Sequence, residues 1–196
     1  MATMYYLFLG LLFVAVLFFG GIGNRAVERR FAGDQPRSIA LGAKARHQDR
    51  IENLRERIVA IAAQEIGVQE ATGHNDGVRV EEYLAYTGLA KGHPWCAAFA
   101  SWCYGQAGLS APRNAWSPAL FPIARRYTEQ QIREETIQPA DLFGIYNRKL
   151  ARIDHVGIVQ KVQGCWIRTV EGNVADQVVS KRRPVLAIHA FSNWLD

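Results

Sequence analysis

The spacing of apolar residues changes once along this chain, and that change limits the possible folds more than any other feature. Up to about residue 108, apolar side chains recur every three or four residues, as in amphipathic helices. From residue 142 onward they alternate every two residues, as in strands with one buried face. Helices followed by strands predict an α+β fold with an antiparallel sheet. The expected strands are 143–146, 153–162, 166–171, 178–182 and 185–191.

The first half of the chain predicts several helices. Apolar residues at positions 51, 54, 58, 61/62 and 65/66 indicate one buried stripe on a helix. Residues 73–77, Gly-His-Asn-Asp-Gly, predict a turn that also caps the next helix. A calcium loop is the alternative for Asn75 and Asp76, but the full acidic spacing is absent, so we favour the cap. The expected helices are 50–67, 78–87, one from Cys96 to Gly105 or Gly108, and a short one within 117–127, followed by a polar surface segment over 128–138.

The N-terminal region contains eighteen uncharged residues, 5–22, which is close to the minimum that spans a bilayer. We interpret residues 1–23 as a signal anchor, 24–49 as a linker and 50–196 as the main folded domain. A cleaved signal peptide is the alternative, but no Lys or Arg precedes the apolar run and no small-x-small site follows it. The basic flank after the run favours a cytoplasmic C-terminal side. That flank comprises Arg25, Arg29, Arg30 and Arg37.

Composition narrows the classes of partner. The formal net charge of +5 and pI of about 9.3 suit a polyanionic partner such as a cell wall or an anionic membrane. Scattered basic residues without interleaved aromatics argue against a nucleic-acid module. The three cysteines, Cys96, Cys103 and Cys165, are too few for a disulfide scaffold. A Cys103–Cys165 bridge is conceivable, but we expect Cys103 to fill the core and Cys165 to lie in a turn. No Cys/His spacing indicates a metal site, and no cofactor is expected.

One cysteine lies where a helix should begin. Pro94 disfavours helix before it, so Cys96 falls in the first turn of the helix that follows. Unpaired backbone N–H groups there favour an anion and lower the pKa of a thiol. The alternative is that Cys96 is core filler, because it shares a helical face with Cys103. A base downstream favours the nucleophile: His155 lies in an alternating strand, with Glu171 and Asn173 further on.

Three motifs together resemble the CHAP family of cysteine, histidine-dependent amidohydrolases and peptidases, which is related to the NlpC-type cell-wall peptidases. They are Pro-Trp-Cys-Ala-Ala-Phe-Ala-Ser-Trp-Cys at 94–103, Asp-His-Val-Gly-Ile-Val at 154–159 and Glu-Gly-Asn at 171–173. The resemblance extends over residues 50–196, including Pro-Ala-Asp-Leu at 139–142, where the family has Pro-Gly-Asp-Leu. One departure is Leu-Ala-Lys-Gly-His-Pro at 89–94, which leaves the side-chain half of an oxyanion hole unassigned.

The resemblance implies a papain-like fold, with N-terminal helices packed on a C-terminal antiparallel sheet. It implies Cys96 as nucleophile, His155 as base, and Glu171 or Asn173 as the third residue. The expected function is thiol hydrolysis of an amide bond in peptidoglycan, by a monomer that is anchored or exported toward the cell wall. Two alternatives stay open: a peptidase or acyltransferase toxin that acts on protein, and an inactive wall-binding module.

The turn near residue 164 sets which residues face His155. Pairing Val162 with Trp166 across a three-residue loop places His155 opposite Asn173, with Glu171 on the same face. Pairing Val162 with Cys165 would send both of those side chains to the far face. We therefore predict the Val162–Trp166 pairing.

Overall fold

The computed structural model describes residues 35–195. The chain divides into two compact units, Met1–Gln48 and Asp49–Asp196. The proposed signal anchor, residues 1–23, lies outside the described residues. Within 35–195, no helix combines the length and the apolar character needed to cross a membrane.

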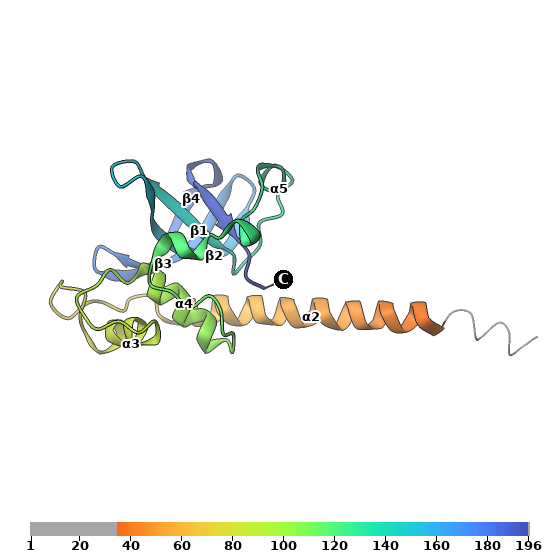
Figure 1. Ribbon diagram of the computed structural model, residues 1–196, viewed down its shortest axis with the longest axis horizontal. Coiled ribbons are helices and arrows are strands. Elements are labelled where there is room, and N and C mark those ends of the chain that lie inside the picture. Colours follow the sequence, from red (N-terminus) through yellow and green to blue (C-terminus); the bar gives the residue numbers. More distant parts are fainter. Residues whose placement is uncertain (1–34, 196) are drawn as a thin grey trace, which may run out of the picture. The chain divides into compact units, whose positions relative to one another are not determined.

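The helical elements precede the sheet, as the apolar spacing predicts (Figure 1). The first helix begins at Gln35 and not at Arg50, so the C-terminal part of the predicted linker is helical. Ala and Lys at positions 40–46 are strong helix formers, but they carry no apolar stripe, and the periodicity therefore did not reveal this helix. The elements are α2 (Gln35–Gln64), α3 (Val78–Tyr86), α4 (Cys96–Gln106), α5 (Glu129–Arg133) and the 3-10 helices η1 (Ser117–Leu120), η2 (Ile123–Arg125) and η3 (Val185–Ala187).

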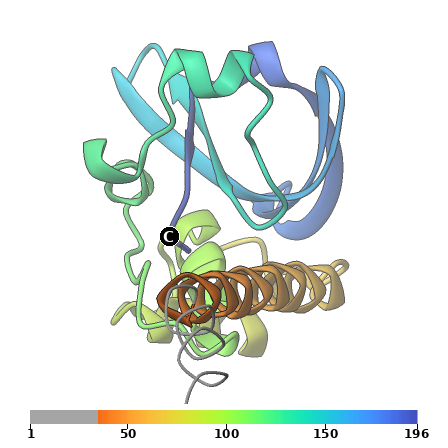
Figure 2. The same ribbon diagram turned by 90° about the vertical axis from the view of Figure 1, so that its right-hand side faces the viewer.

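The second half forms a five-stranded sheet of order β4-β3-β2-β1-β5, in which all neighbours are antiparallel. This confirms the α+β class. The strands are β1 (Leu142–Asn147), β2 (Arg152–Gln163), β3 (Trp166–Val174), β4 (Gln177–Pro184) and β5 (Ala190–Ser192). The predicted strand 185–191 is wrong over its first part, because Pro184 ends β4 and residues 185–187 form η3. Figure 2 shows the sheet curving on one side of α4.

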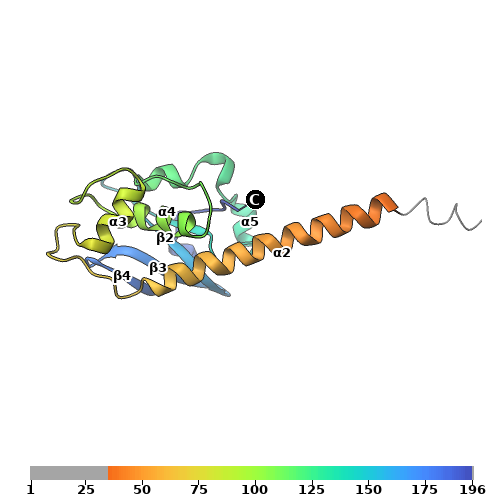
Figure 3. The ribbon, with the colours of Figure 1, turned by 90° about the horizontal axis from the view of Figure 1, so that it is seen from below.

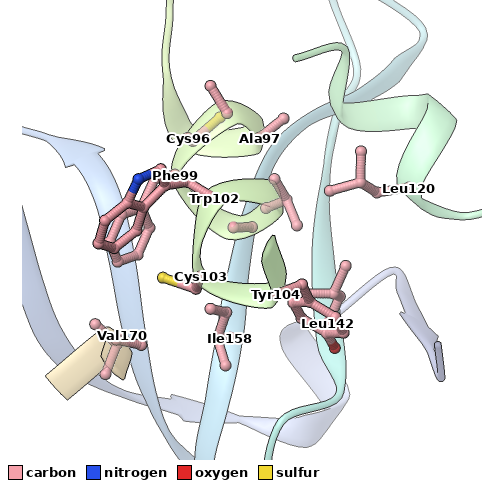
Figure 4. Packing of buried hydrophobic residues seen from close by; sticks show 14 of the residues in the cluster. Cys96, Ala97, Phe99, Trp102, Cys103, Tyr104, Leu120, Leu142, Ile158 and Val170 are labelled. Atoms are coloured by element: carbon pink, nitrogen blue, oxygen red, sulfur yellow. The ribbon is translucent and has the colours of Figure 1, made fainter. Parts of the chain in front are cut away.

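Helix α4 lies between α3 and the sheet (Figure 3). Its apolar residues cover its whole circumference, and a helix of that kind is stable only when it is buried on all sides. Phe99, Cys103 and Tyr104 are completely buried, and Figure 4 shows their side chains with Ile158 and Val170 of the sheet. Cys103 is therefore core filler, as expected.

The turn that opens the sheet is held by two helices. Nη1 of Arg55 in α2 donates to the Pro139 carbonyl and to Oδ1 of Asp141, each at 2.8 Å. The hydroxyl of Tyr104 in α4 donates to the Ala140 carbonyl. Ala140 has a φ of 68°, a region that favours glycine, which agrees with the glycine at this place in the family motif. These bonds fix the start of β1 against the helices.

The β2–β3 hairpin differs from our prediction at its turn. Gln163 pairs with Trp166, so the loop consists of Gly164 and Cys165 alone, and the predicted Val162–Trp166 pairing is wrong. Gly164 has a φ of 59°, which a two-residue hairpin loop requires. A register shift between Val159 and Lys161 then restores the predicted register, in which Ile158 pairs with Val170. The error at the turn therefore does not extend to the residues near His155.

We predict that Arg55→Met lowers the free energy of unfolding by about 3–5 kcal/mol at neutral pH, because it leaves a buried carboxylate without a cation. Burial raises the pKa of Asp141, and the Arg55 guanidinium opposes that rise. Without Arg55 the folded-state pKa should rise further above the unfolded value. The ionised acid then costs stability at neutral pH, and this cost shrinks as the pH falls from the raised folded-state pKa toward the ordinary value of Asp.

Urea denaturation at about pH 7 and about pH 5 measures both effects. Arg57→Met on the same helix is the matched control, since Arg57 makes only an exposed hydrogen bond to the Gln106 carbonyl. The control should stay within about 0.5 kcal/mol of the parent. Equal stability of the Arg55 and Arg57 variants would contradict this account of the turn.

Candidate active site

Cys96 is the first residue of α4, where the sequence placed it (Figure 4). The N-cap residue, Trp95, makes no side-chain capping bond, so the helix terminus has no competing acceptor of its own. The Sγ atom lies 3.5 Å from Oγ of Ser117 and 3.9 Å from the Asp154 carbonyl oxygen. Cys96 is 5% exposed, so its thiol lies in a largely dry environment at the positive end of a helix.

His155 of β2 connects the thiol to a carboxylate. Its Nε2 atom is 2.9 Å from Oε2 of Glu171. The thiol of Cys96 is close enough to raise the pKa of the imidazole. Across the sheet His155 pairs with Ile145 of β1, and its ring meets that of Phe143 edge-on at 6.4 Å between centroids. The imidazole is thus held between two partners and one aromatic wall.

The titration of these two groups is coupled. Burial by itself raises the pKa of Cys96, but the hydrogen bond and charge of His155 outweigh it, and the pKa is lowered. For His155 the effect of burial has the opposite sign and lowers the pKa. The interactions with Cys96 and Glu171 outweigh it and raise the pKa to about 9. A lowered pKa of the thiol and a raised pKa of the imidazole favour transfer of the proton from sulfur to nitrogen. Both shifts favour a thiolate at Cys96 beside an imidazolium at His155.

Glu171 of β3 is a fully buried carboxylate with several donors. Oε1 accepts from Oγ1 of Thr169 at 2.6 Å and from Nε of Arg183 at 2.7 Å. Oε2 accepts from Nη2 of Arg183 at 2.7 Å and faces Nε2 of His155. Although burial opposes ionisation, Arg183 first and then His155 and Thr169 lower the pKa of Glu171 to about 2. The acid is therefore ionised wherever the thiol chemistry operates.

Asn173, the other candidate orienting residue, lies in a different network. It has a φ of 58°, and its Nδ2 donates to Oδ1 of Asn75 at 3.2 Å. The backbone N–H of Asn75 donates to Oε2 of Glu70, whose Oε1 accepts from Nε1 of Trp95 at 2.7 Å. Cys96, His155 and Glu171 thus form one chain of contacts, whereas Asn173 bonds to the loop that supports Trp95.

Three neighbours of the site were missed by sequence reasoning. Ser117 contacts the sulfur from η1, and Thr169 and Arg183 contact Glu171. Thr169 shares its strand and its face with Glu171, so alternation along β3 could have identified it. Arg183 follows two other basic residues, and nothing in the sequence separates it from them without the register of β3 and β4.

The loop before α3 holds no metal cluster. Among residues 35–195, no group of three or more His, Cys, Asp or Glu side chains is placed to bind an ion. The turn supplies the N-cap residue of α3, Gly77, as predicted, but neither Asn75 nor Asp76 makes a side-chain capping bond. Asp76 instead accepts from the backbone N–H of Thr72 at 2.9 Å and from its hydroxyl at 2.7 Å. Its role is to close the turn 72–76.

A hollow of about 360 Å³ lies at the end of β1. Ile145, the strand partner of His155, forms part of its wall, so the hollow is close to the base in the sheet. Tyr146 and His189 stack over it with ring centroids 4.6 Å apart. The lining residues are Ile145, Tyr146, Arg148, Leu186, Ala187, Ile188 and His189.

We predict that iodoacetamide labels Cys96 faster than the other two thiols at about pH 6. The neighbouring His155 lowers the pKa of Cys96, whereas Cys103 is completely buried with a pKa raised by burial, and Cys165 is exposed in a turn. Peptide mass spectrometry of the folded protein measures the three rates. His155→Ala should abolish the preference for Cys96. Equal rates at Cys96 and Cys165 in the unaltered protein would contradict an activated thiol.

Comparison with known families agrees with the geometry. No curated protein matches the chain. A family model described as the CHAP domain matches residues 88–173, a segment that includes Cys96, His155, Glu171 and Asn173. This match supports a CHAP-type assignment for residues 88–173.

Proposed function

We propose that this protein is a papain-like thiol hydrolase that cleaves an amide bond in peptidoglycan. A CHAP domain indicates peptidoglycan hydrolase, amidase or peptidase activity in general. The observation that carries the specific proposal is the buried chain of contacts from Cys96 through His155 to Glu171. An inactive wall-binding domain would have no need of a buried carboxylate bonded to a histidine that in turn bonds a thiol.

In the proposed reaction the thiolate of Cys96 attacks the carbonyl carbon of the amide and forms a tetrahedral oxyanion. The backbone N–H of Cys96 donates to that oxyanion, because the first residue of a helix has no helical acceptor for it. His155 gives its proton to the leaving amine as the C–N bond breaks. Water then attacks the thioester while His155 accepts a proton, and the carboxylic acid leaves as the thiolate returns.

Glu171 is the better candidate for the orienting residue. Its 2.9 Å contact with Nε2 of His155 directs Nδ1 toward the sulfur, and its charge stabilises the imidazolium. Asn173 instead supports the loop 70–76 and, through Asn75 and Glu70, the indole of Trp95. We assign it to holding the N-terminus of α4 in place.

Charge supports peptidoglycan as the partner. With a formal net charge of +5, the chain is attracted to the anionic polymers of a cell wall. In this proposal residues 5–22 anchor the protein, a monomer, to the membrane with its catalytic domain toward the wall. The basic flank after the segment argues for the opposite orientation, so protease accessibility of the catalytic domain in intact cells is the test of topology.

Purified peptidoglycan incubated with the full chain should release muropeptides, and mass spectrometry of the fragments identifies the bond. Cys96→Ala should release none while its thermal unfolding stays cooperative, because only the sulfur is removed. Cys103→Ala, a cysteine in the same helix, is the control for thiol loss and should keep its activity. Cleavage of protein substrates without muropeptide release would contradict the proposed substrate and favour a peptidase or acyltransferase that acts on protein.

The pH dependence of hydrolysis should report the thiolate–imidazolium pair. A histidine whose folded-state pKa is raised loses its proton only near that value, so activity should persist up to about pH 9. Glu171→Gln should lower this alkaline limit and slow hydrolysis by roughly 100-fold, because the imidazolium loses its charged partner.

Asn173→Ala is the matched comparison for that variant. It should keep the alkaline limit and lose at most roughly tenfold in rate, since it acts through the support of Trp95. If Asn173→Ala shifts the alkaline limit and Glu171→Gln does not, the two assignments are reversed.

A further inference from the structure

Arg183 forms a two-bond ion pair with Glu171. Its guanidinium donates through Nε to Oε1 and through Nη2 to Oε2, both at 2.7 Å, so the contact is bidentate. Such a fork fixes the plane of a carboxylate as well as neutralising it. The Arg183 side chain is 24% exposed and the Glu171 side chain fully buried, so this is a largely desolvated ion pair.

The position of Arg183 in the sheet makes this contact notable. In the β3–β4 ladder Arg183 pairs with Ile167, Lys181 with Thr169, and Val179 with Glu171. Lys181 is therefore nearer to Glu171 along the strand than Arg183 is, and it lies on the same face. Lys181 is nevertheless exposed, and Arg183 is the residue that bonds the carboxylate. To reach it, the Arg183 side chain lies along the sheet, with its guanidinium carbon 5.7 Å from the centre of the Phe143 ring.

Phe143 thus contacts both cationic neighbours of Glu171. Its ring lies 5.7 Å from the Arg183 guanidinium carbon and 6.4 Å from the His155 ring centroid. The same carboxylate oxygen, Oε2, faces Nη2 of Arg183 at 2.7 Å and Nε2 of His155 at 2.9 Å. Any rotation of the carboxylate that weakens one of these contacts also weakens the other.

We propose that Arg183 is a positioning residue of the active site: it holds the Glu171 carboxylate in the one orientation in which Oε2 faces Nε2 of His155. Thr169 supports the same orientation by donating to Oε1, the oxygen that His155 does not use. The unit that orients the histidine is then Thr169, Glu171 and Arg183 together. This inference rests on the proposed thiol chemistry, since the orientation matters only if His155 serves Cys96.

A purely structural role is the competing explanation, because an ion pair between β3 and β4 also fastens the sheet. The two explanations differ in what the loss of Arg183 does to the site. If Arg183 only joins β3 to β4, its loss lowers the stability of the protein and changes nothing else. If Arg183 positions the carboxylate, its loss changes the pH range in which an ionised Glu171 supports His155. It also changes the rate at which Cys96 reacts.

The test compares Arg183→Met with Arg182→Met in the full chain. Arg182 is the adjacent residue, is exposed, and lies 4.4 Å over the Trp166 ring, so its loss removes a similar cation from the other face of β4. The first readout is the rate of Cys96 alkylation by iodoacetamide as a function of pH, which needs no knowledge of the substrate. The second is muropeptide release, and thermal unfolding is recorded for each variant.

For Arg183→Met we expect the acidic limb of the alkylation profile to move up by roughly one pH unit or more, because Glu171 now protonates nearer its ordinary range. The plateau rate of muropeptide release should fall by roughly tenfold or more, with KM little changed. Arg182→Met should match the parent in both readouts.

Arg183→Lys keeps the charge but cannot form the fork. It should keep the acidic limb near that of the parent and still lose plateau rate, and it gives the answer if Arg183→Met does not fold. Profiles and rates that coincide with the parent in both variants, with only thermal stability reduced, would overturn the proposal. Normal alkylation behaviour with no muropeptide release in the parent would instead refute the proposed substrate and leave the role of Arg183 measurable.

Discussion

Direct packing of α4 against the backbone of β3 is the constraint on which the site depends. Gly172 lies directly beside Trp95 and Phe99, so closely that a Cβ there would be 2.7 Å from the Trp95 ring and 2.9 Å from Phe99. At Gly172 no side chain separates the helix from the strand. The first turn of α4 therefore lies directly against β3, the strand that carries Glu171. That approach brings Cys96 close enough to His155 for each group to shift the pKa of the other.

The chemistry then depends on the charge of the Glu171 carboxylate, which is buried and hydrogen-bonded at both oxygens. A carboxylate without solvent would normally become neutral, but Glu171 has a guanidinium fork, a hydroxyl and an imidazole around it. Its retained charge raises the pKa of His155, and a protonated His155 lowers the pKa of Cys96. Each group ionises because the next one does, so the three form a coupled unit and their individual contributions are not additive.

Local patterns in the sequence predicted the parts of the site that depend on local geometry. Pro94 and the apolar run after it place Cys96 at a helix start, and alternation places His155 on a strand. The neighbours that depend on strand register were not predictable in this way. Arg183 became visible only through the β3–β4 ladder, and the two-residue loop at Gly164 was misjudged because a later register shift in β2 compensates for it. Asn173 resembles a family site residue, yet it has a left-handed backbone and its side chain bonds to Asn75 of the loop that supports Trp95.

The ionisation state of His155 is the central claim, and nitrogen-15 NMR of its imidazole measures it most directly. In the unaltered chain the two ring nitrogens should both carry protons at neutral pH and titrate near pH 9. In Cys96→Ala the titration should move to lower pH, because the thiolate no longer stabilises the imidazolium. A neutral His155 ring at pH 7 in the unaltered chain, or a titration that Cys96→Ala leaves in place, would contradict a thiolate–imidazolium pair.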